Sequence, residues 1–460
     1  MSERVLPEGW VEVSVGEIAE VVSGGTPKAG DPENFKVAGK GIPWLTPADL
    51  SGYGKKRIAH GARDLSEKGY ASCSAKLMPA GSVLFSSRAP IGHVAISENE
   101  ICTNQGFKSF VFGVGVDSGF AYYYLRSVRG LAESLGTGTT FKEVSGAKVK
   151  SLPFVLPSSE EQKVIADKLD ELLAQVKNLK ARLDAIPAIL KRFRQSVLTA
   201  AVSGQLYSFD NANGWRDVCV GDLAALVTSG SRGWSKYYSD SGELFVRAQN
   251  IKNDVLDLDE VAYVDLPDRA EGTRTKIKEG DFLITITGAN VTKCALVGMD
   301  VGVAYVSQHV GLVRWSERQY GPYLELFLKS ESHGRKQLLD MAYGGGKPGL
   351  NLQNIRDVSL RLPSIEEQTE IVRRVDQLFA FADQIEQQVA NAQARVDKLT
   401  QSILAKAFRG ELTAEWRAAN PDLISGENSA EALLERIKAE KANHKPIRAR
   451  RSTAMERVTP

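Results

Sequence analysis

The clearest pattern in the chain is a long run of apolar residues spaced alternately four and three positions apart, and it occurs twice. Residues 156–206 begin "LPSSEEQKVIADKLDELL", and residues 362–412 begin "LPSIEEQTEIVRRVDQLF", without a gap between the copies. This spacing places one apolar stripe along a helix and predicts a coiled-coil seam. The seam positions are Ile165, Leu169, Leu172, Val176, Leu179, Leu183, Ile186, Leu190, Phe193 and Val197, matched by Ile371, Val375, Leu378, Ala382, Ile385, Val389, Ala392, Val396, Leu399 and Ile403.

The two predicted helices share a start signal. Ser158 and Glu161 in the first copy, and Ser364 and Glu367 in the second, have the spacing of a capping box. A proline precedes each serine, and Gly204 and Gly410 mark the other ends, so each helix has about 45 residues. Pro187 lacks an N–H group and is expected to kink or locally open the first helix. Because a domain-sized stretch separates the copies, we expect antiparallel pairing; the alternative is two helices packed on separate domain cores.

The segments before the helices correspond more weakly. Each opens with Gly-Trp, at Gly9 and Gly214, and each continues as short β-rich stretches bounded by Gly, Pro or Ser. Expected strands are 83–85, 94–96, 245–246, 282–286 and 311–313, and helix-like runs lie near 120–135 and 323–339. We therefore expect mixed α/β (α+β) domains with an internal pseudo-two-fold repeat. The segments are a first globular domain (1–155), a helix (156–206), a second domain (207–361), a second helix (362–412) and a C-terminal region (413–460).

The C-terminal region contains a predicted amphipathic helix, about 429–441, and a basic tail. The helix has an apolar face suited to docking on a partner. Lysine and arginine dominate the tail, which is expected to be disordered, either simply solvated or with nonspecific affinity for nucleic acid. Its basic residues are Lys441, Lys445, Arg448, Arg450, Arg451 and Arg457.

Composition changes this picture little. The chain is 25% charged and 43% hydrophobic, with a formal net charge of +2, as in a soluble globular protein. No apolar run is long enough for a membrane span, and the first residues lack a secretory core, so a cytoplasmic location is expected. The cysteines have no Cys-x-x-Cys spacing, which favours reduced thiols over a zinc site. They are Cys73, Cys102, Cys219 and Cys294.

Catalytic motifs are missing. The segment "GGGKPG" at residues 344–349 lacks the first glycine of a phosphate loop and has Pro348 where a magnesium-binding Ser or Thr belongs. No Gly-x-Ser-x-Gly elbow, dinucleotide fingerprint or amino-methyltransferase motif is present, and the five histidines have no ligand-like spacing. The sequence therefore predicts no catalytic site and no metal site.

The globular domains instead concentrate polar, basic and aromatic residues in loops. Arg can pair with guanine and Asn or Gln with adenine in the major groove, while Thr and Lys suit phosphates. Taken singly, each such loop is more often an ordinary surface turn than a base contact. The candidate DNA contacts are Thr26, Lys28, Arg88, Asn104, Gln105, Thr137, Thr139, Thr140 and Lys142 in the first domain, and Arg232, Tyr237, Arg247, Gln249, Asn250, Asn290, Gln308 and Lys347 in the second.

The chain resembles the DNA-specificity subunits of type I restriction-modification enzymes, in particular the enterobacterial K-type (type IA) branch. The resemblance rests on the "LP-S-EEQ" helix starts, on "ILKRFRQSVLTAAVSGQL" at residues 189–206, and on residues 399–440, which begin "LTQSILAKAFRGELTAEW". In the first domain "SGGTPKAGDPENF", "IPWLTPADL" and "TNQGFKSF" are similar to a common recognition-domain type. The second domain resembles the family mainly through its layout.

The resemblance implies a noncatalytic subunit with two target-recognition domains, each reading half of an asymmetric bipartite DNA site. It also implies two modification subunits, forming an adenine methyltransferase, and two restriction subunits. S-adenosylmethionine, ATP and magnesium would then bind those partners and not this chain. The coiled coil is expected to set the unread spacer. Two alternatives are a fused restriction-methylation enzyme, for which 460 residues leave no room, and a coiled-coil scaffold that reads no DNA.

Overall fold

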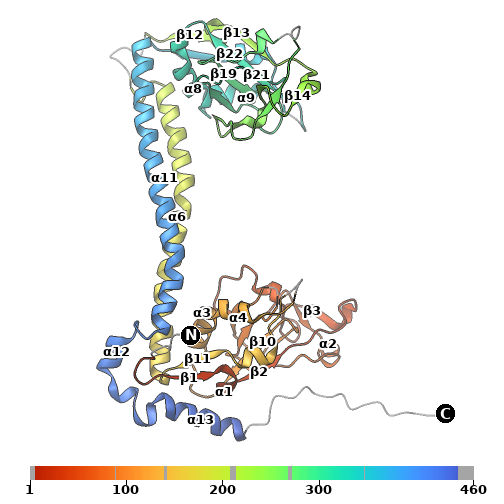
Figure 1. The fold of residues 1–460 in the computed structure, drawn as a ribbon, viewed down its shortest axis with the longest axis vertical. Coiled ribbons are helices and arrows are strands. Elements are labelled where there is room, and N and C mark those ends of the chain that lie inside the picture. Colours follow the sequence, from red (N-terminus) through yellow and green to blue (C-terminus); the bar gives the residue numbers. More distant parts are fainter. Residues whose placement is uncertain are drawn as a thin grey trace, which may run out of the picture. The chain divides into compact units, whose positions relative to one another are not determined.

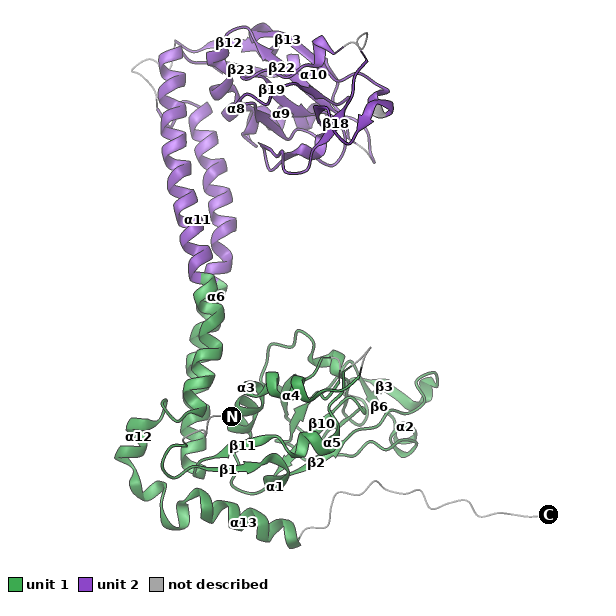
Figure 2. Cartoon of the chain, viewed as in Figure 1, with its two compact units in different colours: residues 1–181, 393–460 green, residues 182–392 purple. Residues whose placement is uncertain are grey.

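The structure, a computed structural model, describes residues 6–88, 90–138, 142–207, 214–267, 272–346 and 348–443. Contacts divide the chain into two compact units (Figure 2). Residues 1–181 with 393–460 make the first unit, and residues 182–392 make the second. The two longest helices contribute to both units, since each end of a helix packs on the core of its own unit.

The first unit is built on a sheet in the order β2-β10-β7-β8-β5. All neighbours are antiparallel except β5 and β8. Its apolar face and the helix α3 enclose a core that includes Phe85, Phe110, Phe120 and Phe154. The strands are β2 (Ala19–Ser23), β5 (Arg57–Ile58), β7 (Val83–Phe85), β8 (Val94–Ser97) and β10 (Lys108–Phe112).

The second unit repeats this sheet without the fifth strand, in the order β13-β22-β19-β20, and here every pair is antiparallel. The positions match strand by strand, so the internal repeat expected from the weak sequence correspondence is confirmed at the level of topology. The strands are β13 (Ala224–Ser229), β19 (Phe282–Thr285), β20 (Cys294–Leu296) and β22 (Val310–Trp315).

Smaller sheets complete each unit. In the first, β1 pairs with β11, β3 with β6 and β4 with β9; in the second, β12 pairs with β23, β16 with β17, and a sheet runs β14-β18-β15-β21. Their bounds are β1 (Val11–Ser14), β3 (Phe35–Val37), β4 (Trp44–Leu45), β6 (Arg63–Leu65), β9 (Cys102–Thr103), β11 (Pro153–Leu156), β12 (Arg216–Cys219), β14 (Tyr238–Ser239), β15 (Glu243–Val246), β16 (Ile251–Lys252), β17 (Val255–Leu256), β18 (Ala262–Val264), β21 (Ala304–Val306) and β23 (Ser359–Leu362).

The short helices follow the repeat as well. Each expected helix-like run is a pair of helices, because the chain turns at Val128 in one and between Ser330 and His333 in the other. The helices are α1 (Val15–Ile18), α2 (Glu67–Ala71), α3 (Ser118–Ser127), α4 (Arg129–Leu135), α5 (Gly146–Lys150), α7 (Val220–Leu223), α8 (Gly321–Lys329), α9 (Gly334–Met341) and α10 (Leu352–Arg356).

The two long helices, α6 (Ser159–Val202) and α11 (Ile365–Phe408), each have 44 residues and pair antiparallel within each unit (Figure 1). In the first unit the Lys180 ammonium contacts the Asp397 carboxylate, and in the second Arg194 donates to Asp383 (2.6 Å). Higher residue numbers in α6 therefore pair with lower residue numbers in α11, as expected for antiparallel helices. Among the predicted seam residues, only Leu179 (44%) and Leu399 (40%) are more than a third exposed.

The helix starts differ in detail between the two copies. In the second copy the cap is reciprocal: the Glu367 N–H donates to Ser364 Oγ, and Glu367 Oε2 accepts from the Ser364 N–H, both at 3.3 Å. In the first copy only the serine half forms, because the Glu161 carboxylate binds other groups. Helix α6 continues through Pro187, where the sequence predicts a kink or a local opening.

The C-terminal region forms α12 (Ala414–Ala419) and α13 (Ala430–Asn443). The predicted amphipathic helix is confirmed, but its apolar face is not free for a partner. Leu433 and Ile437 are buried in the core of the first unit, and Lys441 Nζ donates to the Gly16 and Ala19 carbonyls. The predicted disordered tail beyond residue 443 lies outside the described residues.

Candidate nucleic-acid interface

Three of the predicted DNA-contact loops in the first unit are joined through Ser87. The Ser87 N–H donates to the Gly106 carbonyl (2.8 Å), and the Val144 N–H donates to the Ser87 carbonyl (2.9 Å). Arg88 and Thr137 each form an isolated β-bridge with Glu143. Loops that are far apart in sequence, around residues 88, 105 and 137, therefore lie together at one end of the sheet.

A fourth loop is brought to the same place by close backbone approach. A Cβ atom on Gly24 would lie 2.0 Å from the Thr103 carbonyl oxygen, so only glycine fits there. The Gly25 N–H donates to that same carbonyl (2.9 Å), and next to it Thr26 Oγ1 donates to Gln105 Oε1. The "SGGT" segment thus places Thr26 beside Gln105.

The predicted DNA-contact residues of this unit differ in how exposed their side chains are and in whether other groups of the chain already bind them. Asn104 is half-buried, and its side-chain oxygen accepts from the Gly106 N–H (2.9 Å), so it shapes the turn. Thr139 and Thr140 lie outside the described residues. The sequence prediction omitted Lys108, whose ammonium lies 3.7 Å from the Glu143 carboxylate in the same cluster. The exposed candidates are Thr26, Lys28, Arg88, Gln105, Thr137 and Lys142.

The second unit contains the same junction made with different side chains. The Ile286 N–H donates to the His309 carbonyl (3.0 Å), and the Leu350 N–H donates to the Ile286 carbonyl (2.8 Å). Thr287 and Tyr343 each form a β-bridge with Gly349, as Arg88 and Thr137 do with Glu143. The loops that carry Asn290 and Gln308 therefore occupy the places of the Arg88 and Gln105 loops. Lys347, in the third of these loops, lies outside the described residues.

The second unit also repeats the close backbone approach that requires glycine at position 24. A Cβ atom on Gly230 would lie 2.1 Å from the Val306 carbonyl oxygen, and the Gly230 N–H donates to the Ser307 carbonyl (3.2 Å). Arg247, Gln249 and Gln308 come together around a cavity of about 250 Å³. Arg232 is exposed and Tyr237 is half-buried in the neighbouring segment.

Asn250 is the one candidate that the structure places in the interior. It is 2% exposed, its amide nitrogen donates to the Asp257 and Glu260 carbonyls, and its oxygen accepts from the Arg247 N–H. Every hydrogen-bonding group of this amide except one lone pair is used by the backbone. Asn250 therefore holds the shape of the loop that carries Arg247 and Gln249, and the prediction that it contacts a base is corrected.

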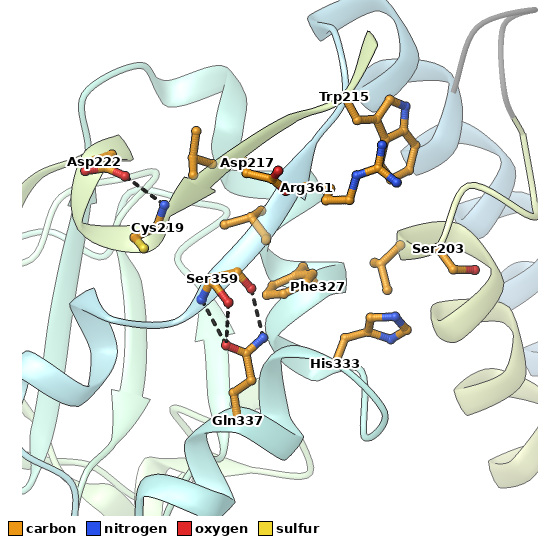
Figure 3. Close-up of a pocket in the computed structure, with 13 residues that line it drawn as sticks. Ser203, Trp215, Asp217, Cys219, Asp222, Phe327, His333, Gln337, Ser359 and Arg361 are labelled. Atoms are coloured by element: carbon orange, nitrogen blue, oxygen red, sulfur yellow. Dashed lines mark hydrogen bonds between the residues drawn. The ribbon is translucent and has the colours of Figure 1, made fainter. Parts of the chain in front are cut away.

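A larger cavity, about 680 Å³, lies in the second unit beside the β12–β23 ribbon and contains none of the predicted DNA contacts. Figure 3 shows Arg361 beside the ring of Trp215, and Gln337 hydrogen-bonded to Ser359. Burial lowers the pKa of His333, which also lines this cavity. The cavity is a feature of the ribbon and the end of α6, not of the loop junction.

The described residues offer little for catalysis. They contain no group of three or more His, Cys, Asp or Glu side chains that suits a metal ion, and no helix among them suits a membrane span. The four cysteines are free thiols. Burial raises the pKa of Cys102 and of Cys294 to about 12, so neither is a thiolate at neutral pH.

Comparisons with known proteins agree on one family. The family model for the "Type I restriction modification DNA specificity domain" matches residues 7–188 and 212–392. The EcoKI specificity subunit of Escherichia coli K12 is 35% identical over 96% of this chain and 97% of its own length. The EcoBI specificity subunit of Escherichia coli is 40% identical over 70% of this chain and 72% of its own.

A solved structure has the same fold. The HsdS subunit of Thermoanaerobacter tengcongensis superposes with a TM-score of 0.59 and 19% identity, covering 89% of this chain and 99% of that one. Since the family model matches once in each unit and the relatives align over the long helices as well, this chain belongs to the type I restriction-modification DNA specificity family.

Proposed function

We propose that this chain is the noncatalytic DNA-specificity subunit of a type I restriction-modification complex, and that each unit reads one half of an asymmetric, bipartite DNA site. The observation that carries this proposal is the repeated loop junction. The backbone arrangement is the same in both units, whereas side chains at matching places differ: the exposed Arg88 against the half-buried Thr287, and Gly106 against the half-buried His309. Similar platforms with different side chains suit the reading of two different sequences.

The partners follow from the proposed role. We propose two modification subunits, which would bind S-adenosylmethionine and methylate adenine, and two restriction subunits, which would bind ATP and magnesium. This chain would carry no cofactor of its own, and the complex would act in the cytoplasm. Net charge is close to neutral, so DNA affinity would depend on local cations such as Arg88 and Lys108 together with those of the partners.

We also propose that the long helices set the spacer between the two half-sites. At about 1.5 Å per residue, each helix is roughly 66 Å long. The proposal is supported by an apolar seam that continues along both helices, and by paired charges that fix its register, such as Arg194 with Asp383. Register and length together would then determine how far apart the two recognised sequences lie.

The test is to coexpress this chain with its cognate modification subunit in a methylation-free host and to map modified adenines across the genome by single-molecule sequencing. A split, asymmetric motif that disappears without this chain is expected. Gln105→Ala is expected to relax one half of the motif, and Gln249→Ala the other. Glu160→Ala, at an exposed position on α6, serves as the control.

The alternative is a coiled-coil scaffold that does not read DNA. It predicts that the complex assembles but that methylation follows no motif, or that Gln105→Ala and Gln249→Ala leave the motif unchanged. Either result, obtained with a complex that is demonstrably assembled, contradicts the proposed function.

A further inference from the structure

The 250 Å³ cavity of the second unit has an aromatic wall. Trp234 and Phe245 stack with ring centroids 5.8 Å apart and an interplanar angle of 27°, and Tyr238 meets Phe245 edge-on at 5.6 Å. All three rings line the cavity. Such a wall offers flat apolar surface to a planar group.

Two polar groups at this cavity have no partner. Ser307 is only 5% exposed, and its hydroxyl makes no hydrogen bond within the chain. The Nε atom of Arg247 is also buried and unpaired, although the Nη2 atom of the same side chain donates to the Glu260 carbonyl (3.4 Å). Buried polar groups are nearly always satisfied, so an orphan hydroxyl and an orphan guanidinium N–H beside one cavity point to an occupant that brings an acceptor.

Gln249 adds a third polar group, exposed in the cavity lining, with an amide that both donates and accepts. The loop that carries Gln249 and Arg247 is held by buried groups. Asn250 ties it to the Asp257 and Glu260 carbonyls, and Asp254, in the following turn, is paired with the buried Arg335. The polar groups are therefore fixed in place before any occupant arrives.

We propose that this cavity holds a single nucleobase of the recognised DNA, swung out of its stack. A base brings a flat ring for Trp234 and Phe245, and an acceptor for Ser307 and Arg247. A paired base inside a duplex presents only its edge in the groove, so it cannot place the face of its ring against these side chains. The proposed base is a second one, distinct from the adenine that the modification subunits would methylate. The inference rests on the proposed function.

The experiment uses the complex of this chain with its modification subunit, bound to a duplex that carries the mapped recognition sequence. Unstacked thymines are detected by permanganate oxidation, and unstacked cytosines or guanines by the fluorescent analogues pyrrolo-deoxycytidine and 6-methylisoxanthopterin placed at each position in turn. One unstacked position outside the target adenines is expected, within the half-site read by the second unit.

The variants tie that base to this cavity. Ser307→Ala is expected to weaken binding about tenfold and to reduce the unstacked signal, and Trp234→Ala to weaken binding about tenfold or more. Because Trp234 also packs in a small core, Ser307→Ala alone decides the outcome if Trp234→Ala does not fold. Thr285→Val is the matched control: it removes another buried, unpartnered hydroxyl of the same unit that does not line the cavity, and should change nothing.

The proposal is overturned if no base other than the target adenines becomes unstacked, or if the signal survives Ser307→Ala unchanged. It is also overturned if Ser307→Ala weakens binding while every base stays stacked, since the cavity would then read only a base edge. Failure of the proposed function is a separate result: the wild-type complex would show no methylation motif at all.

Discussion

Single residues at the helix starts perform tasks that the capping motif alone does not suggest. Glu161 is fully buried and accepts hydrogen bonds from Trp10 Nε1 (2.8 Å), Thr413 Oγ1 (2.6 Å) and Arg417 Nη1 (2.6 Å). One carboxylate therefore joins the start of the chain, the start of α6 and the segment after α11. In the second unit, Trp215 Nε1 donates to Glu367 (3.4 Å), which gives both Gly-Trp segments a partner at a helix start.

Glu161→Ala is expected to destabilise the first unit by about 3 to 5 kcal/mol, because it leaves the largely buried Arg417 without its counter-charge. Urea unfolding of the full chain measures this change. Glu160→Ala, one residue away and exposed, should change the free energy of unfolding by less than about 0.5 kcal/mol. Equal effects of the two variants would contradict the role given to Glu161.

The Asp254–Arg335 pair predicts a dependence on pH. Burial alone would raise the pKa of Asp254, but its hydrogen bonds and charge pairing with Arg335 outweigh this, and the pKa is lowered overall. A lowered folded pKa means that the stabilisation is present above the ordinary value of 3.8 and is lost as the pH falls through the folded value.

Asp254→Asn keeps a residue that tolerates the left-handed backbone at this turn (φ 63°) but removes the charge. It is expected to cost about 3 kcal/mol at neutral pH, a difference that should shrink as the pH falls below 3.8 in urea unfolding. The surface variant Asp300→Asn is the control. A wild-type advantage that is independent of pH would contradict this account.

At the scale of elements, the long helices are determined by short-range signals and by the seam. Gln162 and Gln368 each fold back to donate to the carbonyl of the preceding proline, at 3.0 and 2.9 Å. This explains why the "EEQ" triplet is repeated: its last residue closes the turn that the proline opens. Helix α6 remains continuous at Pro187, although the proline supplies no N–H for the Leu183 carbonyl.

Pro187→Ala is therefore expected to stabilise α6 by restoring that hydrogen bond, raising the free energy of unfolding by about 1 to 3 kcal/mol. The reciprocal change, Gln393→Pro at the matching position of α11, should cost about 3 kcal/mol. Hydrogen exchange of the amides near the two positions reports both effects. A loss of stability in Pro187→Ala would show that α6 requires the proline.

At the scale of the whole molecule, the repeat places one loop junction in each unit and one pair of helices that runs through both. The proposed role of those helices can be measured directly. Removal of seven residues from each helix preserves the heptad seam and shortens each helix by about 10 Å. Methylation is expected to be lost at the original site, or to move to a site with a spacer about three base pairs shorter, at about 3.4 Å per base pair. An unchanged motif in the methylation map would contradict the spacer proposal.

The sequence by itself determined the two long helices, their apolar stripes and the duplication, because these depend on periodicity and on contacts between near neighbours. It also indicated which loops are polar. The sequence did not predict which loops lie together. Their meeting depends on backbone hydrogen bonds across the sheet, as through Ser87 and Ile286, and backbone hydrogen bonds are only weakly related to side-chain identity. In the divergent second unit the matching junction is visible only in the fold.

Burial was likewise decided by the tertiary structure. Asn250 and Gln249 are adjacent and chemically alike, yet one amide is used by backbone carbonyls and the other is exposed at the cavity. The apolar face of α13 was predictable, but not that the first unit of the same chain covers it. The physical reason is the same in each case. The local pattern of apolar and polar residues predicts whether a side chain is suited to a buried or an exposed position, but its actual contacts depend on which distant segments the fold brings next to it.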